Sequence, residues 1–273
     1  MMIVEMIKKQ RLAQIAMVMF VFFVTLWILL YFTVAKDNIG NQIFSATYGL
    51  MALYGAILGF KISKKWGLTK SLMGKSILMF SLGLLAQEFG QLTYSYYAYF
   101  AKIQIPYPSL GDVGYFGCIP LYILGIFYLG KAAGVNISLR SFQRKIEAVI
   151  IPFIILSYSY FVFLQGYQID WSKPLTVFLD FGYPLGQAIY ISIAILTILV
   201  TRGILGGIMK YKVLFIFFAL LVQYFADYMY LYIAKAGTAY PGGPNDVIYL
   251  VAYFLMVLAL LQLRVSAIKS KLT

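Results

Sequence analysis

The chain has 273 residues, of which 62% are hydrophobic and 11% are charged, and its formal net charge is +13. A water-soluble domain is roughly half apolar and about a quarter charged, so this composition excludes an ordinary soluble fold and predicts a multi-pass membrane protein. Histidine is absent and Cys118 is the single cysteine, which excludes an intramolecular disulfide, a histidine general base and the common zinc ligand sets. The sequence therefore gives no reason to expect a metal ion or another cofactor.

Apolar stretches close to the roughly 20 residues that a bilayer core requires recur along the whole chain. The first stretch follows a short basic segment and is longer than a typical cleaved signal sequence, so it is predicted to be a signal anchor. The ends, residues 1–14 and 264–273, are expected to be short basic tails, which makes residues 1–273 a single membrane domain. In chain order the predicted transmembrane helices are eight: residues 16–34, 43–62, 72–101, 112–129, 146–166, 174–201, 212–234 and 246–263.

The basic residues alternate between the two sides of this predicted bundle. Of the 22 Lys and Arg residues, all but Lys36, Lys102, Lys173 and Lys235 fall at the chain ends or in every second connection. The positive-inside rule then puts both termini in the cytoplasm of a protein of the cell membrane. Because the charges are evenly spread, they indicate contact with anionic lipid rather than with nucleic acid.

Two segments of the chain are similar to one another. Residues 84–96 (LLAQEFGQLTYSY) are echoed by residues 220–232 (LLVQYFADYMYLY), and each copy is followed by a Tyr-Pro pair and an Asp-Val-x-Tyr helix start. We interpret this pattern as an internal duplication of a four-helix unit, with repeats at about 13–131 and 146–265. An even number of helices leaves the orientation unchanged, so the repeats are expected to be parallel, about an axis along the membrane normal. The first two helices of each unit match poorly.

Polar side chains recur at helical spacing inside the predicted membrane helices, where a carboxylate costs at least ~2.5 kcal/mol. Such residues form one stripe on residues 72–101, a matching stripe on 212–234 and a third on 174–201. The predicted ligand-binding residues are Gln87, Glu88, Gln91, Tyr94, Asp180, Tyr183, Gln187, Gln223, Asp227 and Tyr230.

Two interpretations of these stripes stay open. The polar residues can line a tyrosine-rich cavity between the repeats that opens outward and receives a ligand or cation, or they can hydrogen-bond neighbouring helices together. Packing is the favoured role for the glutamines and tyrosines, and function for Asp180 and Asp227. Asp112 and Asp246 each begin a helix after a loop, where an Asp caps free N–H groups and suits the helix dipole. Capping is their favoured role, with ligand contact as the alternative.

Three short motifs resemble a known family. They are the Pro-Ser-Leu-Gly-Asp run ending at Asp112, the Asp-Phe-Gly-Tyr-Pro run beginning at Asp180, and the Pro-Gly-Gly-Pro-Asn-Asp run ending at Asp246. In these motifs the chain is similar to the multi-helix integral membrane sensor domains that precede diguanylate cyclase, phosphodiesterase or histidine kinase domains in bacteria and archaea. The resemblance covers roughly residues 84–263 and implies sensing. Since the sequence carries no such effector after Arg264, it also implies signalling through a partner.

The leading hypothesis is thus a receptor-like membrane module that detects a small ligand or a membrane state and signals to a cytoplasmic protein. One alternative is a small-molecule or cation/proton-coupled transporter, in which Asp180 and Asp227 bind a cation or proton at the interface of the repeats. Another is a structural subunit of a membrane complex. No catalytic residue is predicted, and an intramembrane enzyme is the least favoured class because only carboxylates and tyrosines could carry out the chemistry.

Overall fold

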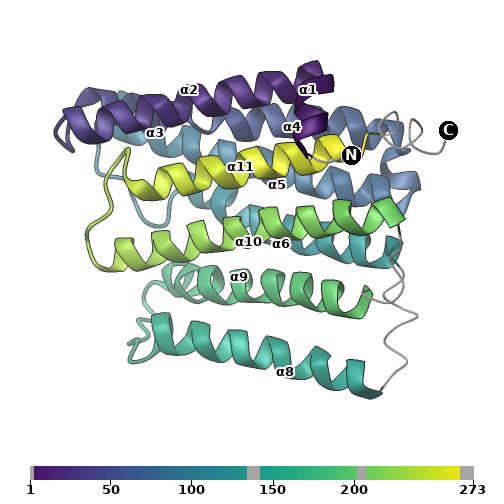
Figure 1. Cartoon of the computed structure of the whole chain (residues 1–273). Coiled ribbons are helices and arrows are strands. Elements are labelled where there is room, and N and C mark those ends of the chain that lie inside the picture. The colour runs from purple at the N-terminus through teal and green to yellow at the C-terminus, as the bar shows by residue number, and fades with distance from the viewer. Residues whose placement is uncertain (1–2, 134–141, 202–206, 265–273) are drawn as a thin grey trace.

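The computed structural model describes residues 3–133, 142–201 and 207–264. The predicted all-α class is confirmed: the long helices run side by side through one bundle (Figure 1). In chain order they are α1 (Ile3–Lys9), α2 (Arg11–Thr33), α3 (Ile39–Thr47), α4 (Leu50–Lys65), η1 (Leu68–Lys70), α5 (Leu72–Ser95), η2 (Tyr96–Ala101), α6 (Leu110–Ala132), α8 (Phe142–Ser159), η3 (Tyr160–Leu164), α9 (Pro174–Thr201), α10 (Gly207–Lys235) and α11 (Pro244–Gln262).

The described part of the chain contains seven stretches long and apolar enough to cross a membrane, so the chain is a multi-pass membrane protein. Six lie in α2, α6, α8 with η3, α9, α10 and α11, and the seventh is formed by α3 and α4 together. Helix α5 is long enough but is not among the seven, because its buried face carries serine, glutamine and glutamate side chains.

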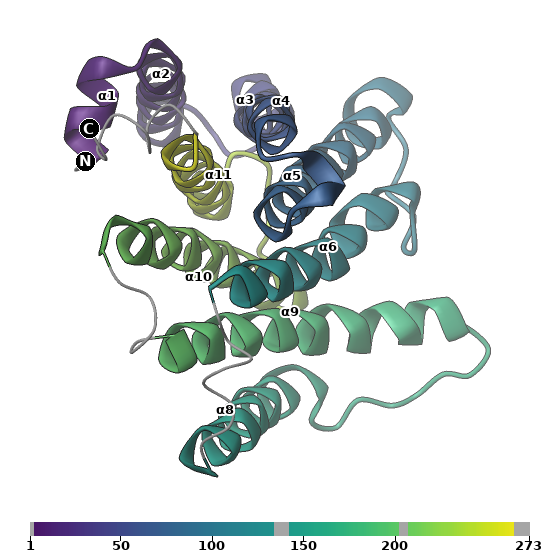
Figure 2. The same cartoon turned by 90° about the vertical axis from the view of Figure 1, so that its right-hand side faces the viewer.

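Six helices close a ring when the bundle is viewed along its axis (Figure 2). Neighbouring members pack in the order α4, α5, α6, α9, α10 and α11, and α11 returns to α4. Helix α2 packs outside the ring on α11, and α8 packs outside it on α9. The side chains that face the centre of this ring are therefore shielded on every side by helices.

The closest approach in the ring joins α5 to α6 through glycine. A Cβ built on Gly114 would lie 2.4 Å from the carbonyl oxygen of Ala86 and 2.5 Å from the backbone nitrogen of Gly90. Small residues let helix backbones approach closely, which strengthens packing where lipid gives no hydrophobic driving force. Gly182 and Gly186 do the same for α9, where they lie against Phe116 and Ile119 of α6.

The short basic N-terminal segment contains a helix of its own. Residues 3–9 form α1, in which Lys9 pairs with Glu5 one turn away (2.9 Å) and Met6 is fully buried. The buried methionine and the i, i+4 ion pair stabilise a helix that a count of basic residues does not reveal.

The predicted single helix over residues 43–62 is interrupted. Helix α3 ends before Tyr48, α4 begins after Gly49, and at the break Met51 donates to the Tyr48 carbonyl (3.1 Å), a tighter turn than in an α-helix. The side chain of Gln91 on α5 donates to the Ser45 carbonyl (2.5 Å) and so binds a backbone acceptor beside the break. A contact from another helix thus accompanies the interruption.

Both α1 and the last turn of α11 lie at one end of the bundle, called here the termini end. There the Trp66 indole donates to the carbonyl of Leu263 (2.7 Å) and the Lys212 ammonium donates to that of Gln262 (2.7 Å). The last carbonyls of a helix have no partner within it, so these two side chains cap α11. The loops 102–109, 165–173 and 236–243 lie at the other end, called here the loop end.

Replacing Lys212 with methionine is expected to lower the free energy of unfolding by about 1.5–3 kcal/mol, because a buried carbonyl loses a charged donor while the aliphatic stem is kept. Unfolding in mixed micelles followed by circular dichroism measures the change. Lys64→Met is the matched control, since Lys64 is exposed in the last turn of α4, and it should stay within about 0.5 kcal/mol. Equal losses in the two variants would contradict the capping role of Lys212.

Candidate functional site

Asp227 of α10 lies buried at the centre of the ring, with only 6% of its surface exposed. Its Oδ1 accepts from the Gln223 amide (3.0 Å) and its Oδ2 from the Tyr190 hydroxyl of α9 (3.2 Å), and the side chain of Tyr249 on α11 also bonds to it. Three neighbouring helices thus hold one carboxylate through neutral donors. In the part of the chain that the structure describes, no ion pair with Asp227 is found.

The two glutamines of α5 occupy the other half of the ring centre. Gln91 Oε1 accepts from the Tyr115 hydroxyl of α6 (2.8 Å) and from the Tyr48 hydroxyl (3.3 Å). Gln87 donates to Cys118 of α6 (3.0 Å) and accepts from the Tyr253 hydroxyl of α11 (3.3 Å).

These bonds form three groups, on Gln91, on Gln87 and on Asp227, which together link α5, α6, α9, α10 and α11 and, through Tyr48, the segment between α3 and α4. We call this set the central polar network, and its members are Tyr48, Gln87, Gln91, Tyr115, Cys118, Tyr190, Gln223, Asp227, Tyr249 and Tyr253.

Two other predicted residues are buried in the ring with a side-chain oxygen that has no hydrogen-bond partner among the described residues. Glu88 is 3% exposed and its Oε2 has no hydrogen-bond partner, and Gln187 is 5% exposed with a free Oε1. Tyr94 and Tyr230 lie nearer the loop end, within electrostatic range of Asp246, and Tyr230 keeps 42% of its surface exposed.

Asp112 caps α6, whereas Asp246 binds the loop that precedes α11. Asp112 forms a capping box with Ser109 and also accepts from the Tyr183 hydroxyl of α9 (2.6 Å). Asp246 accepts from the backbone N–H of Gly242 (2.8 Å), which lies before the N-cap Gly243, and bonds to Ser45 of α3. Each carboxylate therefore also connects its helix to a different segment of the bundle.

Asp180 lies apart from Asp227, so the structure does not bring the two predicted carboxylates together. Asp180 sits near the start of α9 at the loop end, where Oδ1 accepts from Tyr107 (2.7 Å) and Oδ2 from Tyr167 (2.5 Å). The hydrogen bond to Asp180, with smaller effects of burial and of the Asp180 and Asp170 charges, raises the pKa of Tyr167 from 10.0 to about 12.

This bond predicts a pH dependence at the loop end. Because the folded-state pKa of Tyr167 is raised, the stability it contributes is complete below pH 10 and is lost as the pH rises to about 12. Tyrosinate absorbance of the wild type minus that of Tyr167→Phe isolates this phenol, and we expect it to ionise near pH 12. When the same difference is taken between Asp180→Asn and the double variant Asp180→Asn/Tyr167→Phe, the pH at which Tyr167 ionises should move toward 10. Ionisation at the same pH in both backgrounds would contradict the assigned cause.

Several members of the central polar network were not among the predicted site residues. Tyr190 continues the stripe of Tyr183 and Gln187 one turn further, so the spacing contained its signal. Tyr115 and Tyr249 are the tyrosines of the repeated Asp-Val-x-Tyr motif, and the repetition itself could have marked them. Nothing in the sequence around Tyr48 distinguishes it from the many other tyrosines.

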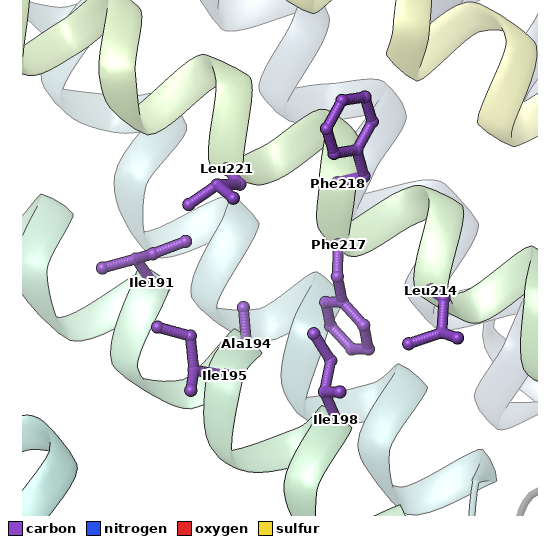
Figure 3. A pocket seen from close by; sticks show the side chains of 8 residues that line it. All are labelled: Ile191, Ala194, Ile195, Ile198, Leu214, Phe217, Phe218 and Leu221. Carbon is purple, nitrogen blue, oxygen red and sulfur yellow. The ribbon is translucent and has the colours of Figure 1, made fainter. Parts of the chain in front are cut away.

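An apolar groove lies outside this network, between α9 and α10 (Figure 3). Its volume is about 190 Å³ and it contains no predicted site residue. Hydrocarbon side chains alone line it, so it offers a polar ligand no side-chain hydrogen bond. Its lining residues are Ile191, Ala194, Ile195, Ile198, Leu214, Phe217, Phe218 and Leu221.

The donor set of the ring centre consists of phenols, amides, carboxylates and one thiol. Within residues 3–133, 142–201 and 207–264, no group of three or more Cys, Asp or Glu side chains could hold a metal ion. Comparison with protein-family models, with curated proteins and with solved structures finds no match for this chain.

Proposed function

We propose that the protein is a receptor-like membrane module that binds a small ligand or responds to a membrane state and passes the change to a partner. The observation that carries this proposal is the setting of Asp227, a buried carboxylate balanced by donors from three helices. A ligand, cation or proton that competes for this carboxylate would change contacts on α9, α10 and α11 together. Buried polar groups of this kind inside a membrane bundle are functional candidates by default.

We propose further that α5 is an eighth membrane crossing. It stands within the ring between α4 and α6, and its exposed residues Leu85, Phe89 and Leu92 recur at the spacing of one helix face. The polar residues that lower its mean hydropathy face the bundle, as expected for a helix that presents one face to lipid and the other to a polar core.

The packing of the ring supports a parallel repeat of four helices. If α4, α5 and α6 correspond to α9, α10 and α11, then each neighbouring pair in one half has a counterpart in the other. The bond from Tyr115 to Gln91 corresponds to that from Tyr249 to Asp227.

The same correspondence extends to the second helix of each unit, where sequence similarity is weak. When α4 is matched with α9, the Tyr48–Gly49 break corresponds to the Tyr183–Pro184 step, where a proline favours a kink. This correspondence supports a duplication about an axis normal to the membrane.

The charge distribution favours a cytoplasmic location for the termini end in the cell membrane. The basic residues Lys64 and Lys65 in the last turn of α4, Lys70 in η1 and Lys75 in the first turn of α5 lie at this end together with α1, whereas the loop end carries isolated lysines. The loop end then faces the outside. The capped end of α11 is the part best placed to report a change to a cytoplasmic signalling protein.

A conformational readout tests this proposal without a known ligand. In a Cys118→Ser background, spin labels at positions 64 on α4 and 211 on α10 report the separation of two exposed sites at the termini end. A sensor predicts that Asp227→Asn changes the distance distribution, because a ligand-responsive site must differ between two arrangements. Asp180→Asn is the control. A stable Asp227→Asn protein with an unchanged distribution would favour a structural subunit and oppose the sensor.

The buried carboxyl group of Asp227 also suits a transporter, which is the second candidate. Ionisable side chains buried in a membrane bundle mark the ion and proton pathways of transporters. Charge movement or solute uptake in proteoliposomes that is lost in Asp227→Asn would replace the sensor by a transporter. The absence of flux in liposomes that contain correctly folded protein would remove this candidate.

A further inference from the structure

Glu88 lies against the break between α3 and α4. A Cβ built on Gly49 would be only 2.0 Å from Glu88 Oε2 and 3.2 Å from its carboxyl carbon. With 3% of its surface exposed, the side chain is buried, and Oε2 has no hydrogen-bond partner among the described residues. The absence of a side chain at position 49 is what admits the carboxyl group.

The break gives this carboxyl group an unusual electrostatic setting. Helix α4 begins at Leu50, directly after Gly49, so its first turn starts where Oε2 lies. Backbone N–H groups at the start of a helix favour a negative charge. An ionised Glu88 would therefore gain some stabilisation here that a carboxylate facing continuous helix would not.

Among the residues that the structure describes, no cation is found beside this carboxyl group. The titratable groups that interact with Glu88 are Tyr48 at the break and Tyr115 of α6, and neither carries a positive charge. In the described ranges the ion pair that is found joins Lys9 to Glu5, at the termini end. Burial without a cation favours the neutral carboxyl, whereas the helix start favours the carboxylate, so the two states are brought closer in free energy.

A row of polar groups leads from Glu88 toward the loop end. Ser95 and Tyr99 lie on the same face of α5 and η2 as Glu88, seven and eleven residues further along. In the described residues the Ser95 hydroxyl is buried without a protein partner, and so are the two amide atoms of Asn245 at the start of α11. The Tyr99 hydroxyl is also buried and lies beside the side chain of Ser45. Buried polar atoms that the protein does not satisfy are usually held by ordered water.

We propose that Glu88 is a proton-binding site, reached from the loop end along the Ser95 and Tyr99 face of α5. It differs from Asp227, both of whose carboxylate oxygens are already paired. The site does not depend on the proposed sensory function. A proton would bind to Oε2 whether the protein signals, transports or stabilises a complex, and the test below measures the proton directly.

Infrared difference spectroscopy of the protein in lipid nanodiscs tests this proposal. Stepping the pH should produce the carbonyl stretch of a protonated carboxyl group, which Glu88→Gln removes and Asp227→Asn retains. A pH-induced spectrum unchanged by Glu88→Gln would overturn the proposal. A response of the same band to sodium at constant pH would also overturn it, in favour of a cation site.

Gly49→Ala supplies a second variant that keeps the carboxyl group. The backbone at Gly49 is helical (φ −62°, ψ −16°), so alanine fits the backbone. Its Cβ would displace the Glu88 carboxyl group and would lie in contact with Gln91 Cγ (3.4 Å). Loss of the helix start should raise the proton affinity by about three- to tenfold and move the midpoint to higher pH. Gly117→Ala, which meets nothing within 4 Å, is the control. Equal midpoints in both variants would refute the role of the break.

Discussion

Replacing Gly114 with valine is expected to lower the free energy of unfolding by about 3 kcal/mol or more, the upper part of the range for overpacking. The reason is that the new side chain meets backbone and not a movable side chain: the Ala86 carbonyl oxygen and the Gly90 nitrogen lie 2.4 and 2.5 Å from the position of its Cβ. Helices α5 and α6 must then separate along the interface that orders Gln91 and Tyr115. Equilibrium unfolding in mixed micelles measures the loss.

Gly117 provides a control on the same helix, three residues away. A Cβ there meets nothing within 4 Å, so Gly117→Val should cost no more than about 1 kcal/mol, the scale of helix propensity differences. If both substitutions destabilised equally, the loss would reflect the helix and not the contact. If Gly114→Val were silent, the close approach of α5 and α6 would be wrong.

The multi-pass helical class could be predicted from the sequence because lipid imposes it. A bilayer core accepts only segments that satisfy their own backbone hydrogen bonds, so long apolar stretches such as residues 174–201 become helices with few alternatives. Hydropathy describes α5 less well, because Gln87, Glu88 and Gln91 face other helices and not lipid. A hydropathy average does not distinguish a polar face turned inward from a segment outside the membrane.

The interruption at Tyr48–Gly49 could not be predicted from local sequence. A glycine pair such as Gly55 and Gly59 sits in α4 without breaking it, so glycine alone is no signal. The Ser45 carbonyl beside the break is bound by Gln91, which is 46 residues away in the chain. Interactions of this range depend on the fold that they help to form.

The candidate site was predictable to the extent that helical spacing specifies a face. That spacing selected Gln87, Gln91 and Asp227, which all lie in the central polar network, but it does not say which stripes meet. Asp180 and Asp227 have similar sequence surroundings and lie in different environments. Their separation follows from the position of Asp180 near the start of α9, beside Tyr107 and Tyr167, and that position depends on where the helix begins.

Replacing Asp227 with alanine is expected to cost about 3 kcal/mol or more, because each buried donor left unsatisfied costs about 1–3 kcal/mol and three donors lose their acceptor here. Asp227→Asn should cost only about 1 kcal/mol, since the amide keeps one acceptor and a phenol can accept as well as donate. The free energy of unfolding of each variant, measured in mixed micelles, ranks them. Asp180→Ala, at the loop end, is the control and should stay within about 1 kcal/mol.

A double-mutant cycle separates the contribution of the hydrogen bonds from that of the lost volume. If Asp227→Ala is costly because donors are stranded, adding Tyr249→Phe should recover part of the loss, since removing both partners of a buried bond is nearly neutral. If the cost comes from the cavity alone, Tyr249→Phe should add its own penalty. A positive coupling would show that Asp227 acts through the bonds it accepts. A competing ligand could then act on α9, α10 and α11 by displacing those bonds, without opening a new cavity.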